Sequence, residues 1–323
     1  MHFLVCPVSS VASVVTISVY SGNILAHMAQ QTDNGLTGLI ARLHALLDRV
    51  EPLVPAIPDV PDFSRHIACR WRVPGRGPGF LQTLRTLHDI RLEDLRGIDR
   101  QRDELERNTR QFLAGLPANN ALLTGARGNG KSSLVKALLN RYQDRGLRLI
   151  EVDAHHLVDL PDIVSHLADQ PQRFIIFCDD LSFEADEPGY KALKSVLDGS
   201  FSVAPDNVLI YATSNRRHLM PEYLSENREA RMIDGEIHPG EAVEEKVSLS
   251  ERFGLWLSFQ PFDQDTYLEA VWHWLERLGA DTSDHDTLQR EALQWALARG
   301  SRSGRVAWQF ARDTAGQQQL GRP

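Results

Sequence analysis

The sequence has few cysteines, and they form no pattern. Cys6, Cys69 and Cys178 are odd in number and far apart, and no C-x-x-C pair is present. Structural zinc sites and disulfide frameworks need paired or regularly spaced cysteines, so neither is expected. Sparse, unpaired thiols are typical of proteins in a reducing compartment, and we expect a cytoplasmic protein.

Basic residues are missing from the start of the chain, where no Lys or Arg precedes Arg42. Residues 3–19 are apolar, but a secretory signal requires a basic beginning. The run also contains Pro7 and several serines, and it is short for a membrane span. We therefore expect no stable membrane association. We expect residues 1–34 to be a disordered or non-native extension, with Met28 as the alternative start.

Two catalytic motifs are also absent. The chain has neither an H-E-x-x-H zinc motif nor a G-x-S-x-G nucleophile elbow. Its formal net charge is −8, which argues against a protein that coats nucleic acid non-specifically. A local basic patch is compatible with this charge. Arg70, Trp71, Arg72 and Arg76 could contact nucleic acid, or Trp71 could simply pack on the next domain.

Strands and helices alternate in the middle of the chain. Apolar strands are predicted over 121–123, 148–152, 174–178 and 208–212, with helices over 133–142, 160–169 and 190–197. This alternation predicts an α/β fold whose parallel sheet carries helices on both faces. After Pro261 only helical patterns remain, over 263–278, 286–299 and 305–314. We therefore divide the chain into a helical and linker region (35–89), an α/β core (90–260) and a small all-helical lid (261–323).

The most specific motif follows the first of these strands. The pattern G-x-x-x-x-G-K-[ST] begins at Gly125 and ends at Ser132, between an apolar strand and a helix. Glycines let backbone N–H groups turn toward phosphates, and the helix N-terminus adds partial positive charge. Lys131 would contact the β- and γ-phosphates, and Ser132 would offer its hydroxyl to Mg²⁺. The predicted nucleotide-binding residues are Gly125, Ala126, Arg127, Gly128, Asn129, Gly130, Lys131, Ser132 and Ser133, with ATP and Mg²⁺ as ligands.

An acid pair, Asp179 and Asp180, ends the apolar strand 174–178. A carboxylate at a strand end can hold Mg²⁺, often through water, and we assign this role to Asp179. We expect Asp180 to orient the attacking water. Glutamate is the common residue in that position, so aspartate shortens the reach, and Glu184 is the alternative base.

Three further residues complete the predicted site. Asn215 follows the strand 208–212 and could reach the γ-phosphate or the water, with Thr213 as the competitor. Arg252 lies close after the core and could stabilise transition-state charge in a neighbouring subunit. Arg305 opens the last helix, where a positive charge is locally unfavourable, which favours a ligand role. Arg302 is the alternative to Arg305.

In this order, the motifs resemble the AAA+ ATPases: Walker A, Walker B, sensor 1, arginine finger and sensor 2. Within that superfamily the chain looks like the bacterial family of unknown function numbered eight-one-five. The resemblance rests on the loop and on LRGIDRQ (95–101), NTRQF (108–112), GEIHP (235–239) and LSERFGLW (249–256), and it spans about 70–316. It implies ATP binding, hydrolysis and assembly into a homo-oligomer whose arginine finger acts in trans. It implies no particular substrate.

Two function classes remain open. The first is an Mg²⁺-dependent ATPase that remodels an unidentified protein partner. The second is a slowly hydrolysing switch, similar to helicase loaders and replication initiators, that acts on DNA or on a DNA-bound protein; the acid pair favours this branch. A small-molecule kinase fits poorly, since no acceptor motif is present. The long polar segment 216–248 could contact a partner, or it could be a solvated insertion.

Overall fold

The computed structural model describes residues 38–39, 41–46, 49, 60–75, 77–86, 88–183, 188–198, 205–215, 231–233, 236–238 and 251–321. The chain divides into two units, Met1–Ala56 and Ile57–Pro323, and the second holds the candidate site. The expected extension 1–34 lies outside the described residues. Within the described part of the chain, no helix is both long and apolar enough to cross a membrane.

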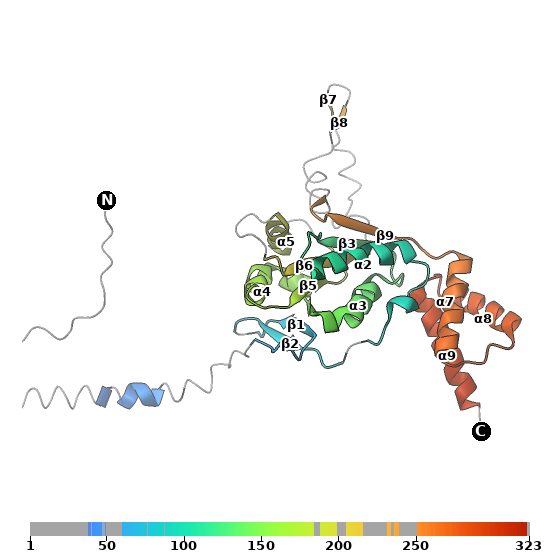
Figure 1. Cartoon of the computed structure of the whole chain (residues 1–323), viewed down its shortest axis with the longest axis horizontal. Helices are drawn as coiled ribbons and strands as arrows, with labels where there is room; N and C mark the ends of the chain where they lie inside the picture. Colours follow the sequence, from blue (N-terminus) through green and yellow to red (C-terminus); the bar gives the residue numbers. More distant parts are fainter. Residues whose placement is uncertain are drawn as a thin grey trace, which may run out of the picture. The chain divides into compact units, whose positions relative to one another are not determined.

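The second unit is built on a seven-stranded sheet (Figure 1). The strands are β1 (Ala68–Arg72), β2 (Phe80–Thr83), β3 (Ala121–Gly125), β4 (Leu147–Glu151), β5 (Arg173–Cys178), β6 (Val208–Ser214) and β9 (Leu255–Phe259). Their order across the sheet is β2-β1-β4-β5-β6-β3-β9. Of these pairings, only β1 with β2 is antiparallel. The carboxyl ends of β3, β5 and β6 therefore lie at one edge of the sheet.

Helices cover both faces of this sheet, which confirms the predicted α/β class. Along β5, side chains alternate between two cores: Ile175 and Phe177 join one, while Phe174 and Ile176 join the other. The first core also takes the apolar residues of α2 (Asp99–Leu113) and α3 (Lys131–Tyr142). The second takes those of α4 (Leu160–Leu167) and α5 (Pro188–Asp198). Both faces are thus closed to water, as near-continuous apolar strands require.

Three strands of the seven-stranded sheet were not predicted. The expected helical and linker region 35–89 contributes β1 and β2 to the sheet, which corrects that expectation for residues 68–83. Strand β9 was also missed. Trp71 is only 2% exposed and its Nε1 donates to Asp159 at 2.9 Å, while Arg70 pairs with Glu151 at 2.7 Å. Of the two alternatives for Trp71, the structure supports packing within the protein. The indole ring is too buried to stack on a nucleic-acid base.

The predicted helical lid is present as α7 (Gln264–Arg277), α8 (His285–Ala298) and α9 (Gly304–Leu320), grouped together in Figure 1. Each helix begins after a residue whose side chain accepts a hydrogen bond from the first turn: Asp263, Asp284 and Ser303. Buried Tyr267 of α7 donates its hydroxyl to the Ala292 carbonyl oxygen at 2.9 Å, which ties α7 to α8. The lid helices are therefore held together by contacts among themselves.

The segment 216–248 contains a short antiparallel pair, β7 (Arg231–Ile233) and β8 (Glu236–His238). The backbone of these two strands is described, and the other residues of the segment lie outside the described part of the chain. Three short 3₁₀ helices, η2 (Leu92–Asp94), η3 (Gln143–Arg145) and η4 (Ala154–Asp159), link larger elements of the sheet unit.

Candidate functional site

The loop between β3 and α3 has the curled backbone that a phosphate-binding loop requires. Gly125 has φ +131°, and a Cβ there would lie 2.1 Å from the Phe259 carbonyl oxygen on the neighbouring strand β9. Gly130, with φ +92°, immediately precedes α3. Other residues avoid these conformations, so the glycines are needed for the path of the chain. The path leaves the amino end of α3 facing the loop, where its unpaired N–H groups can bind an anion.

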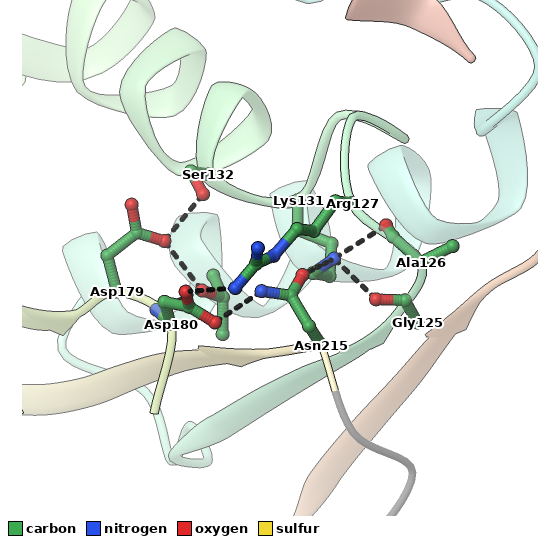
Figure 2. Close-up of polar contacts among 9 residues, drawn as sticks. Gly125, Ala126, Arg127, Lys131, Ser132, Asp179, Asp180 and Asn215 are labelled. Atoms are coloured by element: carbon green, nitrogen blue, oxygen red, sulfur yellow. Dashed lines mark hydrogen bonds and ion pairs between the residues drawn. The ribbon is translucent and has the colours of Figure 1, made fainter. Parts of the chain in front are cut away.

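Lys131 is the first residue of α3, and its side chain points back to the start of the loop (Figure 2). Its Nζ donates to the carbonyl oxygens of Gly125 at 2.6 Å and Ala126 at 2.8 Å, and to Asn215 Oδ1 at 3.1 Å. The side chain is buried, and this desolvation lowers the pKa of its ammonium group, although Asp179 and Asp180 oppose the shift. No described carboxylate forms an ion pair with this ammonium group, so a phosphate would give it a direct charge partner.

Ser132, Asp179 and Thr213 form a cluster of oxygen atoms beside the lysine. Ser132 Oγ donates to Asp179 Oδ1 at 2.5 Å, and Thr213 Oγ1 donates to the same atom at 2.6 Å. Hydroxyl and carboxylate oxygens are the ligands that Mg²⁺ prefers, and a nucleotide site usually supplies only one or two of them. The residues present therefore fit Mg²⁺, and Ser132 and Asp179 are the two that would hold it. Thr213 instead orients Asp179.

Asp180 is held in an unusual conformation. It is the only non-glycine residue with positive φ in the described part of the chain, at +54°. Its backbone N–H donates to Thr213 Oγ1 at 2.9 Å. Its carboxylate accepts hydrogen bonds from Asn215 Nδ2 and from Arg127, the latter at 3.3 Å. Figure 2 shows Asn215 between Lys131 and Asp180, so one amide group contacts both.

Arg127 was predicted only as a member of the loop, and its contact with Asp180 was missed. Glu184, the alternative base, lies outside the described residues. Asn129 was also predicted only as a nucleotide-binding residue of the loop. Its buried side chain donates to the Gln260 carbonyl oxygen at 2.8 Å and so anchors the loop to the end of β9. Neither contact has a signal in the sequence pattern.

The lid meets the loop at the start of α9. The Arg305 backbone N–H donates to the Gly128 carbonyl oxygen at 3.1 Å, and buried Ser303 lies beside the same glycine. The guanidinium of Arg305 is near enough to contribute to the lowered pKa of Lys131. Both arginine side chains are exposed, and among the described contacts only Arg305 meets the loop. The structure therefore brings Arg305, and not Arg302, to the loop, and the role of Arg305 toward the phosphates stays a prediction.

Replacing Gly128 should separate this lid contact from a simple backbone effect. Gly128 has φ +84°, and an added Cβ would lie 2.8 Å from Ser303 Oγ, whereas Gly146 has φ +88° and an added Cβ would meet open space. We expect Gly146→Ala to cost about 1–2 kcal/mol of unfolding free energy, as alanine does in left-handed backbone. Gly128→Ala should cost about 1 kcal/mol more, because the lid must shift.

Denaturant unfolding of both variants, together with ATP titrations, measures this difference. Only Gly128→Ala should also weaken ATP binding. Equal stability losses in the two glycine variants, with unchanged ATP affinity, would contradict a tight contact between lid and loop.

Arg252 is placed by a different contact. Its Nε donates to Asp198, the last residue of α5, and a quarter (25%) of its side chain is exposed. The role of Arg252 as a finger for a neighbouring subunit stays a prediction. Among the described residues, no group of three or more His, Cys, Asp or Glu side chains is arranged to hold a metal ion.

Several solved structures resemble this chain at low identity. Orc1 of Aeropyrum pernix, solved in complex with DNA, is 16% identical over 71% of this chain and 62% of that chain, with a TM-score of 0.49. The RuvB Holliday junction branch migration motor of Thermotoga maritima is 12% identical, covering 70% of this chain and 71% of that one, with a TM-score of 0.39. A DNA replication initiation factor is 14% identical, with coverages of 72% and 64% and a TM-score of 0.43.

The chain thus spans less than two thirds of the Orc1 structure's length. Likeness at this level carries no information on activity or partners. No curated protein matches the chain. The family described as "Protein of unknown function (DUF815)" matches residues 64–318, a range that includes the loop, the acid pair, Asn215, Arg252 and the lid arginines. This match covers most of the chain, so the protein belongs to that family, as its motifs predicted.

Proposed function

We propose that the protein binds ATP with Mg²⁺ and hydrolyses the β–γ phosphoanhydride bond. The observation that supports this best is the convergence of Lys131, Ser132, Asp179 and Asn215 at the carboxyl ends of β3, β5 and β6. Parallel α/β sheets bind ligands at this edge. The lysine ammonium suits the phosphates, the serine and aspartate oxygens suit Mg²⁺, and the asparagine amide suits the γ-phosphate.

In this proposal the backbone of 125–133 and Lys131 bind the phosphates. Ser132 and Asp179 hold Mg²⁺, which when bound neutralises phosphate charge. Asp180 accepts the proton of the attacking water or orients it, and Asn215 positions both Asp180 and the γ-phosphate. Arg305 approaches the phosphates from the lid.

We further propose that the protein works as a cytoplasmic homo-oligomer on an unidentified protein partner. Arg252 supports this, because a partly exposed arginine beside the core can act on a neighbouring subunit's nucleotide. The Asp198 contact would hold Arg252 in place within the free subunit. The segment 216–248, which carries β7 and β8, is the proposed partner contact.

The test is ATP turnover measured against protein concentration. We expect specific activity to rise steeply with concentration as subunits assemble. Arg252→Ala should reduce turnover about 10³-fold, the effect known for arginine fingers, without weakening ATP binding. Mixing Arg252→Ala with Lys131→Ala subunits should restore part of the activity, because each supplies what the other lacks. If turnover per subunit is independent of protein concentration and unchanged in Arg252→Ala, Arg252 does not act on a neighbouring subunit.

A second candidate function is a nucleotide-dependent switch or loader that hydrolyses slowly. The supporting observation is that Asp180 is engaged by both Arg127 and Asn215, which restrains the expected base. Such a protein would act on DNA or on a DNA-bound protein. DNA binding that requires ATP and weakens with salt would support this branch, and its absence at every salt concentration would remove it.

A further inference from the structure

A charged cluster joins the lid to the segment that precedes α2. Buried Asp94 accepts a hydrogen bond from His273 Nε2 at 3.1 Å, and Arg277 lies against its other carboxylate oxygen. Arg96 contacts His273 Nδ1 at 3.2 Å and Glu269 at 3.7 Å. We call these five residues the clasp. Its two halves are far apart in sequence.

The clasp uses one face of the lid helix α7. Glu269, His273 and Arg277 are spaced four residues apart, which places them in a row along the helix. Backbone geometry supports the same approach: Gly97 has φ +71°, and a Cβ there would lie 2.1 Å from Thr266 Cγ2 in the first turn of α7. Segment 94–97 therefore packs along α7, with contacts from Thr266 in its first turn to Arg277 at its end.

The same segment also packs on the phosphate loop. A Cβ on Gly130 would lie 3.3 Å from Ile98 Cδ1 and 3.9 Å from Leu95 Cδ2. Segment 94–98 therefore stands between the start of α3 on one side and α7 on the other. Since α7 packs on α9, whose first residues contact Gly128, the lid touches the loop by two routes.

We propose that Arg96 and His273 are positioning residues, and that the clasp fixes the lid over the nucleotide and so sets ATP affinity. This inference rests on the proposed ATP binding. Neither residue touches the phosphate loop, so both act through Leu95, Ile98 and α9.

The hydrogen bonds of the clasp require a neutral His273. Nε2 faces a carboxylate and must carry the proton, while Nδ1 faces the Arg96 guanidinium and must accept. Burial and then Arg96 lower the pKa of His273, while Glu269 and Glu276 oppose the shift. Protonation would place an N–H against a guanidinium, with Arg277 also nearby. The clasp should therefore be intact above the lowered pKa and weaken as the pH falls through it.

The test begins with exchange of backbone amide hydrogens in the nucleotide-free protein. We expect Arg96→Ala and His273→Ala to raise exchange in α7 and in 92–98 about tenfold and to weaken binding of a fluorescent ATP analogue by about the same factor. Arg100→Ala is the matched control, because Arg100 is an exposed residue of α2 that pairs with Glu104. It should change neither quantity.

His273→Gln gives the second measurement, since glutamine can donate to Asp94 and accept from Arg96 but does not titrate. Between about pH 7.5 and pH 5.5, wild-type affinity should fall about fivefold more than that of His273→Gln. The comparison cancels the titration of ATP itself. Wild-type exchange and affinity in both alanine variants, or a His273 pKa above its ordinary value by NMR, would overturn the clasp. Failed ATP binding by the wild-type protein would refute the proposed function instead, and the exchange data would still test the clasp.

Discussion

Replacing Lys131 with alanine should weaken ATP binding severely while leaving the fold intact. Charge-assisted hydrogen bonds to phosphate contribute about 1.5–3 kcal/mol each, and Lys131 is positioned to make them to two phosphates. We therefore expect an affinity loss of at least about 100-fold. Titration with a fluorescent ATP analogue measures it directly, with thermal stabilisation by ATP as the second readout.

The stability of the nucleotide-free protein distinguishes this loss from misfolding. Burial lowers the pKa of Lys131 below 10.5, so at neutral pH the folded state carries a desolvated charge. That unfavourable contribution is complete below the lowered pKa and disappears as the pH rises toward 10.5. Lys131→Met removes this unfavourable charge together with the hydrogen bonds from Nζ to Gly125 and Ala126, so its unfolding free energy at pH 7 should stay within about 1–2 kcal/mol of wild type. Its stability relative to wild type should fall as the pH rises.

Lys136 provides the matched control, because it lies on the same helix and is only partly exposed. Lys136→Ala should bind ATP like wild type. Unchanged ATP affinity in Lys131→Ala would refute nucleotide binding at this loop.

The parts of the site formed by neighbouring residues could be predicted from the sequence. The contacts between residues far apart in the sequence could not. The loop, its flanking strand and its helix follow from glycine spacing and an apolar run, which are properties of neighbouring residues. The contact of Arg127 with Asp180 depends on the direction in which a glycine-rich loop projects each side chain. That direction depends on the positive φ angles of Gly125, Gly128 and Gly130. The sequence motif shows where glycines stand, but it does not give the values of these angles.

Strands β1 and β2 illustrate the same limit. Each is short, and a Gly/Pro-rich loop separates them, so neither shows a long alternating pattern. The assignment of β1 depends on a partner strand about eighty residues away, as in the contact of Arg70 with Glu151. Strand β2 in turn pairs with β1. The clasp is more remote still, because Asp94 and His273 become neighbours only after the lid has packed.

Asp180 should be the residue whose loss separates ATP binding from hydrolysis. We expect Asp180→Asn to lower turnover about 10²–10⁴-fold, the usual contribution of a general base, while ATP affinity stays within a few-fold of wild type. Single-turnover hydrolysis and equilibrium binding measure the two quantities separately. Because bound ATP would persist, this variant is also the best bait for capturing the partner.

The choice of asparagine follows from the backbone. Asp180 has φ +54°, a region that asparagine enters readily and alanine does not. Asparagine also preserves the size of the side chain beside Asn215 and Arg127. Asp180→Ala would add backbone strain. A fall in turnover could then come either from the loss of the carboxylate or from a shift of the backbone at the end of β5. Exposed Asp169, which follows α4, provides the control substitution to asparagine.

The contact with Arg127 decides between the two candidate functions. If the Arg127–Asp180 pair restrains the base, Arg127→Ala should raise the hydrolysis step several-fold in single-turnover experiments. If Arg127 instead binds phosphate, the same variant should lose affinity and gain no rate. A faster Arg127→Ala favours the slow switch, because wild-type hydrolysis is then held back by a contact built into the loop. Wild-type turnover in Asp180→Asn would exclude Asp180 as the base and make Glu184 the next residue to replace.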